Sequence, residues 1–313
     1  EDAYHNVLRL GEEGNDKKII AAATGNLGII YETRGELDQA VEQYMKALAL
    51  HEELDSKEGM AADFGNLGQI HQTRGELERA EEYYRKVLTL EDELGRKWSK
   101  ATAYGNLGNI HLTRGNLDRA EEFHRKALVL NEEIGNKENM ARNYDNLGII
   151  YKERGNLDRA EEFHRKALIL NKELGRKQGM AHQYGNLGII HRMRGELDRA
   201  VEQYMKALAL NEDLGRKEGM AANYGNLGNI HLTRGELDRA EELYMKALAL
   251  NEELGRKEGM AIQYNNLGAL EKERGNRDAA CGHWAKALAL FMEVGMADEI
   301  AKVQDLMKES GCE

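Results

Sequence analysis

Hydrophobic residues recur at spacings of three and four along most of the chain, and glycine interrupts the pattern at fixed places. The first such stripe contains Leu27, Ile30 and Tyr31, which lie on one face of a helix that we expect at about 18–34. The next stripe predicts a second helix at about 37–54. The glycine between them ends the first helix, because glycine adopts the left-handed backbone conformation without steric cost.

The whole arrangement returns every 40 residues. Two series of glycines lie at the expected helix ends: Gly35, Gly75, Gly115, Gly155, Gly195, Gly235 and Gly275, and Gly95, Gly135, Gly175, Gly215, Gly255 and Gly295. Self-similarity at a fixed period is typical of solenoids, which grow by stacking. We therefore predict seven helical hairpins over residues 18–296. Residues 1–17 match the second helix of a truncated preceding repeat, and residues 297–313 match a C-terminal capping helix at about 297–309.

Each repeat also has small residues inside its helices. Gly28 and Ala40 recur in all seven repeats. Glycine within a helix costs about 1 kcal/mol relative to alanine, so its repetition indicates a steric need where the two helices cross. The chain is therefore predicted to be all-α.

These columns resemble the tetratricopeptide repeat. Two motifs carry the resemblance: Tyr104-x-x-Leu107-Gly108-x-x-His111 and Ala120-x-x-x-His124-x-x-Ala127. The usual repeat has 34 residues and a proline after its second helix, whereas this one has 40 and places Glu132 there. The long form is similar to repeats of the LGN/Pins scaffold family and of bacterial tetratricopeptide proteins. This resemblance implies a right-handed α-solenoid, a superhelix of hairpins that binds extended peptides along its concave groove.

An asparagine recurs on the face of the first helix opposite its packed stripe. The column comprises Asn26, Asn66, Asn106, Asn146, Asn186, Asn226 and Asn266. It resembles the asparagine ladder of a glycosyltransferase with a long tetratricopeptide superhelix, in which the amides hold a peptide backbone. A carboxamide both donates and accepts hydrogen bonds, so it pairs with any peptide unit. The alternative is that each asparagine bonds a neighbouring helix and stabilises the stack.

Positions that vary between repeats are expected to give specificity. Gln69, Asn109 and Asn229 lie next to the ladder in sequence. A basic group, with apolar residues between its members, comprises Arg142, Lys152, His182 and Arg192. This group favours a peptide with acidic and apolar side chains, unless its members are only solvated helix residues. Trp98 replaces a glutamate in an inter-repeat link, which indicates a local plug or an exposed contact.

Composition excludes several classes of protein. The formal net charge of −11 argues against broad binding of nucleic acid or anionic membranes. No apolar run is long enough to span a bilayer. Cys281 and Cys312 are too few for a disulfide framework or metal site, which favours a reducing, cytoplasmic location. No catalytic, metal or cofactor motif is present, so we expect no enzyme activity.

Two columns are predicted to be structural. The arginines that close each first helix suit the helix dipole: Arg34, Arg74, Arg114, Arg154, Arg194, Arg234 and Arg274. Histidines such as His71 and His111 replace a tyrosine in a packing column, as hydrogen-bonded fillers. The predicted function is a scaffold for a protein or peptide partner. The alternatives are a sensor arm of a larger signalling protein and an array that self-associates.

Overall fold

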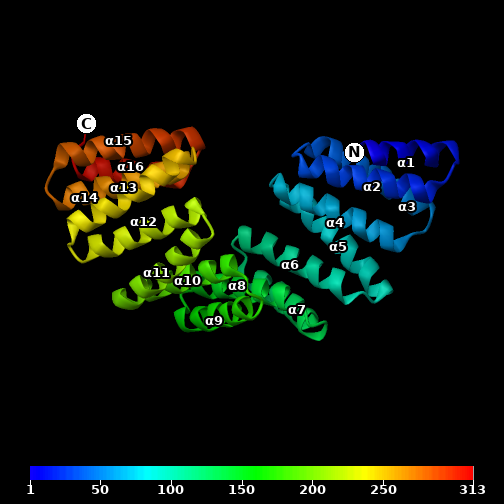
Figure 1. Cartoon of the computed structure of the whole chain (residues 1–313), viewed down its shortest axis with the longest axis horizontal. Helices are drawn as coiled ribbons and strands as arrows, with labels where there is room; N and C mark the ends of the chain where they lie inside the picture. Colours follow the sequence, from blue (N-terminus) through cyan, green and yellow to red (C-terminus); the bar gives the residue numbers. More distant parts are fainter. Residues whose placement is uncertain (313) are drawn as a thin grey trace. The chain divides into compact units, whose positions relative to one another are not determined.

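The computed structural model describes residues 1–312, and every regular element in that range is an α-helix (Figure 1). The helices are α1 (Asp2–Glu13), α2 (Lys17–Thr33), α3 (Leu37–Glu53), α4 (Lys57–Thr73), α5 (Leu77–Leu94), α6 (Lys97–Thr113), α7 (Leu117–Glu133), α8 (Lys137–Glu153), α9 (Leu157–Glu173), α10 (Lys177–Met193), α11 (Leu197–Asp213), α12 (Lys217–Thr233), α13 (Leu237–Glu253), α14 (Lys257–Glu273), α15 (Arg277–Val294) and α16 (Ala297–Glu309). The all-α prediction is confirmed. The even-numbered helices α2 to α14 are called first helices below, and α3 to α15 second helices.

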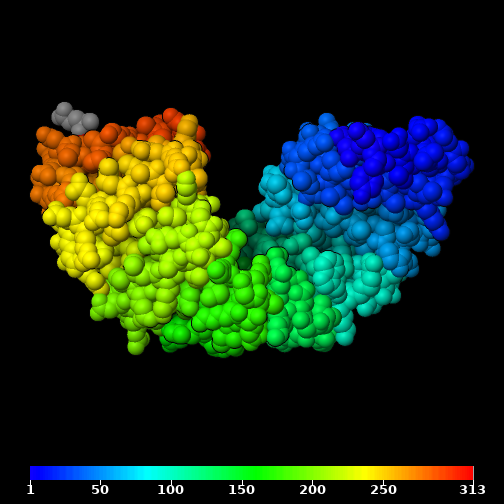
Figure 2. Space-filling model, viewed as in Figure 1, coloured from blue at the N-terminus to red at the C-terminus, as the bar shows by residue number. Residues whose placement is uncertain are grey.

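Packing divides the described chain into two units, residues 1–156 and 157–312. In the first unit the hairpins α2–α3, α4–α5 and α6–α7 stack in chain order, and each second helix also contacts the next first helix. In the second unit α9 contacts α10, the hairpins α10–α11, α12–α13 and α14–α15 follow in the same way, and α16 contacts α15. Figure 2 shows this inside each unit as bands of colour that border one another in sequence order. Each unit is therefore a solenoid of helical hairpins.

The turns between helices use left-handed backbone, as the glycine pattern predicts. Gly35 has a φ of 78°, and the other glycines of both series also have positive φ. Asn15 and Asp55, with φ of 49° and 51°, occupy the equivalent turns that have no glycine. Both residue types tolerate this conformation, because their short polar side chains hydrogen-bond locally.

In α2, α4, α6, α10, α12 and α14 the glycine inside the helix faces an aromatic ring of its own hairpin. A Cβ added to Gly28 would lie 2.7 Å from Tyr44, and one added to Gly188 would lie 2.6 Å from Tyr204. Tyr44 and Tyr204 are fully buried. The predicted close helix crossing is confirmed, and the ring that fills it explains why a side chain is excluded.

The C-terminal end departs from the sequence prediction. Cys281 of α15 and Cys312 form a disulfide across 31 residues. Beside it, Val303 of α16 packs with Trp284 and Phe291 of α15. Two cysteines are too few for a disulfide framework, but they form this single disulfide because the packing of α16 on α15 brings them together. Disulfides persist in oxidising compartments, so the cysteines give no support to a cytoplasmic location.

Candidate binding surface on the first helices

The asparagine column places one half-buried side chain on each first helix. Two of these side chains bond within their own unit. Asn26 donates to a carbonyl one turn earlier in α2 at 2.8 Å, and Asn146 donates to Oδ1 of Asn109 on α6 at 3.0 Å. Asn106 lies near the Tyr84 hydroxyl, which donates to Oε1 of Gln72 at 3.1 Å. Asn26 and the Asn146–Asn109 pair therefore contribute to the fold, and that pair joins two first helices.

The remaining asparagines divide into two kinds. Asn186 has an interaction partner within the described chain. The side chains of Asn66, Asn226 and Asn266 form no hydrogen bond with another described residue, and all three line hollows in the surface. Their carboxamides keep both donor and acceptor capacity. At these three positions the carboxamide is accessible for the peptide hydrogen bonds that the ladder prediction requires.

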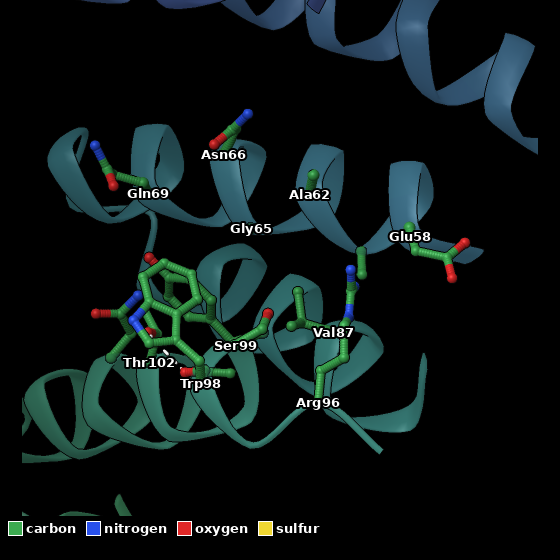
Figure 3. A pocket seen from close by; sticks show the side chains of 14 residues that line it. Glu58, Ala62, Gly65, Asn66, Gln69, Val87, Arg96, Trp98, Ser99 and Thr102 are labelled. Atoms are coloured by element: carbon green, nitrogen blue, oxygen red, sulfur yellow. Dashed lines mark hydrogen bonds between the residues drawn. The ribbon is translucent and has the colours of Figure 1, made fainter. Parts of the chain in front are cut away.

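The first hollow, of about 420 Å³, lies between α4 and α6 over α5. Asn66 and Gln69 line it from α4, and Asn106 lines it from α6. Tyr84 and Val87 of α5 also line it, so three consecutive helices build the site. Figure 3 shows the two amides of α4 on the same side of that helix, facing the open space.

Small residues keep this hollow open. Ala62 and Gly65 lie on α4 between the polar side chains, and a Cβ added to Gly65 would meet nothing within 4 Å. In Figure 3 the Trp98 indole stands above α6 beside Thr102 and is directed toward α4. Trp98 is 61% exposed, so it is an exposed contact surface and not a plug. The sequence singled out Trp98, but nothing in it placed the indole beside the ladder.

The second hollow, of about 250 Å³, lies at the equivalent place between α12 and α14. Asn226, Asn229 and Asn266 line it, as Asn66, Gln69 and Asn106 line the first. The two sets are 160 residues apart, which is four repeats, so the hollow is a property of the hairpin geometry. Glu258 and Ile262 replace Trp98 and Thr102, and Glu258 gives the second hollow a second carboxylate beside Glu218.

The variable amides beside the ladder also have partners. Gln69 donates to Oε1 of Glu32 at 2.6 Å, and the Tyr44 hydroxyl donates to the other oxygen of that carboxylate at 2.9 Å. Asn229 accepts a bond from the Tyr244 hydroxyl at 2.8 Å. Burial, and then the Glu32 carboxylate, raises the pKa of Tyr44. Buried second-helix tyrosines thus reach through the hairpin and orient polar groups at the hollow face.

The four predicted basic residues do not all remain available. Arg142 pairs with Glu138 at 2.7 Å, and Lys152 pairs with Glu153 at 3.0 Å, both in the first unit. His182 and Arg192 belong to the second unit and are both exposed. Each unit therefore presents two of the four residues, and in the first unit carboxylates already neutralise them.

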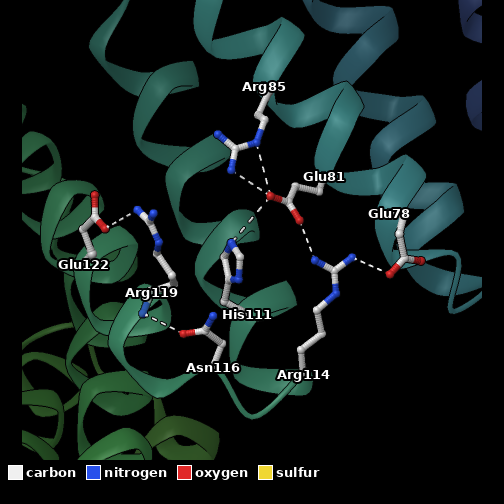
Figure 4. A network of polar contacts seen from close by, with 8 residues as sticks. All are labelled: Glu78, Glu81, Arg85, His111, Arg114, Asn116, Arg119 and Glu122. Atoms are coloured by element: carbon white, nitrogen blue, oxygen red, sulfur yellow. Dashed lines mark hydrogen bonds and ion pairs between the residues drawn. The ribbon is translucent and has the colours of Figure 1, made fainter.

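The arginine column joins consecutive hairpins. In Figure 4, Arg114 reaches back to Glu78 at 2.9 Å and to Glu81 at 2.5 Å, both on α5. Arg74 and Asp38 make the same contact at 2.5 Å. The structural role of these arginines is confirmed, and the acidic partners of Arg74 and Arg114 lie 33 or 36 residues earlier, on the second helix of the preceding hairpin.

The histidines of the first helices are buried fillers, but not all are hydrogen-bonded as predicted, since both ring nitrogens of His111 are buried without a hydrogen-bond partner. His71 bonds to Glu76 at 2.7 Å, whereas His111 stacks on Phe123 with ring centres 5.3 Å apart. Burial lowers the pKa of His111. Within residues 1–312, no group of three His, Cys, Asp or Glu side chains is placed to hold a metal ion. In the same range, no helix combines the length and apolarity needed to cross a bilayer.

Comparison with known proteins identifies the family. The model described as Tetratricopeptide repeat matches residues 19–91, 99–173 and 179–253, which make up most of the chain. The chain therefore belongs to the tetratricopeptide repeat family. Among curated proteins, none matches it.

Several solved structures share the fold. The apo form of RapI has 15% identity and a TM-score of 0.73, covering 88% of this chain and 99% of that one. The apo quorum sensor NprR from B. thuringiensis has 15% identity and a TM-score of 0.67, covering 99% and 97%. A signal transduction ATPase with numerous domains and a tetratricopeptide repeat sensor, from Pyrococcus horikoshii, has 19% identity and a TM-score of 0.72. The match covers 96% of this chain and 46% of the ATPase chain. At these identities the likeness shows the fold alone.

Proposed function

We propose that the chain is a non-enzymatic interaction scaffold that binds extended peptide segments along the first-helix face of its units. Membership of the tetratricopeptide repeat family supports the scaffold, because such repeats are generally non-catalytic binding modules. The observation that carries the peptide proposal is the pair of equivalent hollows, the first lined by Asn66 and the second by Asn226 and Asn266, whose side chains form no hydrogen bond with another described residue. Such carboxamides suit a peptide backbone of any sequence.

The proposed ladder therefore contains fewer asparagines than the column in the sequence. Asn66, Asn226 and Asn266 are its binding members, whereas Asn26 and Asn146 stabilise their own unit. A preference for acidic side chains rests on Arg192, which is exposed, because Arg142 and Lys152 have carboxylate partners. Each ladder bond contributes about 0.5–1.5 kcal/mol, so side-chain pockets must supply the rest of the affinity.

A peptide-library pull-down with matched variants tests the proposal. The combined Asn66→Ala, Asn226→Ala and Asn266→Ala variant should fold normally and retain little of the peptide bound by the unmodified chain. The control, Asn26→Ala with Asn146→Ala, should unfold at a lower temperature and select the same peptides. Equal peptide recovery by the unmodified chain and the triple variant would refute the ladder.

The second candidate is a sensor arm of a larger signalling protein. The fold of the archaeal signal transduction ATPase, whose repeats form a sensor, favours it. Both candidates use the same binding face, and they differ in what the binding event controls. Sequencing of the complete gene decides between them, since the sensor requires an effector domain in the same protein.

A further inference from the structure

We propose that the hollow between α4 and α6 binds a lysine or arginine side chain of the peptide, with Glu58 as its anionic partner. This inference rests on the proposed peptide-binding function and adds the chemistry of one subsite. Three observations carry it: the aromatic and aliphatic walls of the hollow, the unpaired carboxylate at its rim, and an arginine that fills the equivalent position in the second unit.

The walls suit a long side chain with an apolar stem and a cationic end. Val87, Ala61 and Ala103 line the hollow with aliphatic surface, and Trp98 adds an exposed indole. The stems of lysine and arginine bury well against such surface while the charge stays near water. A cation over an indole face gains further stabilisation from the negative face of the ring.

Glu58 is the acidic group of this hollow, and the nearby charge of Arg96 acts on it without a direct contact. It lies on α4 at the rim, and it forms no ion pair or hydrogen bond with another described residue. Figure 3 places Arg96 close to it, at the start of α6. Nε and one Nη of Arg96 bond instead to Glu91, at 2.8 Å and 2.6 Å. The neighbouring cation Lys57 is also occupied, because it pairs with Glu93 at 2.5 Å.

The second unit shows what the Glu58 position binds. Its equivalent there is Glu218, and Arg256 stands at the Arg96 position. Arg256 pairs with Glu218 at 2.9 Å. The pairing is free to form because Asn251 replaces Glu91, so no buried carboxylate draws the arginine away. In the second hollow the Arg256 guanidinium is already paired with the Glu218 carboxylate. In the first hollow the Glu58 carboxylate has no such ion pair and can bind a cation of the ligand.

The test uses immobilised peptide arrays of random twelve-residue sequences with one fixed central residue, either Arg, Lys, Gln or Glu. The unmodified chain should bind the Arg and Lys arrays about tenfold more than the Gln array. Glu58→Gln should reduce that ratio to below about twofold. The matched Glu218→Gln should leave the ratio unchanged, because that carboxylate already holds Arg256.

Glu91→Asn gives an independent test that leaves Glu58 intact. Asparagine occupies this position in other repeats, such as Asn251, so the variant is expected to fold. The released Arg96 should then pair with Glu58, as Arg256 does with Glu218, and the preference for central Arg should fall as it does in Glu58→Gln. Trp98 fluorescence reports occupancy, since Trp98 is exposed and the other tryptophan, Trp284, is fully buried.

Two results would overturn the inference, and they are distinguishable. Peptide binding without a preference for central Arg or Lys, or with a preference that survives Glu58→Gln, refutes this subsite and leaves the scaffold proposal standing. Absence of binding to all four arrays, with no change in Trp98 emission, refutes the peptide-binding function together with the subsite.

Discussion

The two units fill one buried position of the second helix with different chemistry. This junction position faces the following first helix. Its occupants are His51, Glu91 and Asn131 in the first unit, and Asn171, Asn211, Asn251 and Phe291 in the second. In the first unit His51 pairs with buried Asp63 at 2.6 Å, and the Glu91 carboxylate pairs with Arg96. In the second, the Asn251 amide donates to a carbonyl of its own helix at 2.8 Å.

The difference teaches how a repeat tolerates polar residues in its core. The buried amides of Asn171 and Asn251 donate to a carbonyl of their own helix, a partner that every repeat supplies, whereas Oδ1 of Asn131 and of Asn211 has no hydrogen-bond partner in the described chain. A buried carboxylate needs a cation, which only a particular side chain supplies. The His51 and Glu91 junctions of the first unit therefore depend on single partner residues, whereas the three asparagine junctions of the second unit depend on the close approach of a glycine backbone. Because Arg96 pairs with Glu91, it forms no ion pair with Glu58.

The largest expected effect comes from removing the cation at a charged junction. Arg96→Leu leaves Glu91, which is 1% exposed, as an unpaired buried carboxylate, and should lower the free energy of unfolding by about 3–5 kcal/mol. In the second unit Asn211 takes the place of Glu91. Arg216→Leu therefore leaves no buried carboxylate unpaired and should lower the free energy of unfolding by less than about 1 kcal/mol. Urea unfolding of both variants measures the difference, and equal losses would contradict the contrast between units.

The next effect is a dependence on pH in the first unit. Burial lowers the pKa of His124 to about 4 from an ordinary value of 6.5. Between these values the unfolded chain holds the proton and the folded chain does not, so this contribution is complete above pH 6.5. As the pH falls to 4, about 3 kcal/mol of unfolding free energy is lost.

His124→Tyr should remove this dependence, because Tyr204 fills the equivalent position in the second unit. The measurement is the melting temperature of both proteins between pH 7 and pH 4.5. A slope that is the same in the variant and in the unmodified chain would show that His124 is not the titrating group.

A smaller effect should follow from crowding an amide junction of the second unit. A Cβ at Gly219 would lie 2.5 Å from the side chain of Asn211, so Gly219→Ala should cost about 1–3 kcal/mol. Gly185→Ala is the control. Its added Cβ would meet nothing within 4 Å, so better helix propensity should stabilise it by up to about 1 kcal/mol. Thermal unfolding of the pair decides whether backbone approach is what these junctions require.

The smallest effect is expected at the arginine column, which the two units share. Arg74→Ala and Arg234→Ala each remove a bond to an aspartate that is 98% exposed, Asp38 or Asp198. Each should cost less than about 1 kcal/mol, because water screens such pairs. Similar small losses of unfolding free energy in both variants would show that the two units differ at their junctions and not in their surface ion pairs. A large loss in only one variant would show that the units differ in their surface ion pairs as well.

Much of the fold was predictable from the sequence because its signals are local. Spacings of three and four fixed the helices, and the glycines fixed the turns, including the close approach of Gly28 to Tyr44. The site was predictable only in part. The sequence placed Asn66 on the right face, but Asn26 and Asn146 share that face and serve the fold.

The 40-residue pattern by itself determined the family, the hairpin as the unit of stacking, and the face that carries the asparagines. Only the tertiary structure decided which polar groups are occupied. Arg74 pairs with Asp38 across 36 residues, and Cys281 forms a disulfide with Cys312 across 31 residues. Trp98 lines the same hollow as Asn66 of the preceding hairpin. Periodicity is a property of one helix, whereas a hollow or an ion pair depends on the positions of two or three helices at once. For that reason the same column of letters gives a structural bond in one repeat and an open binding position in the next.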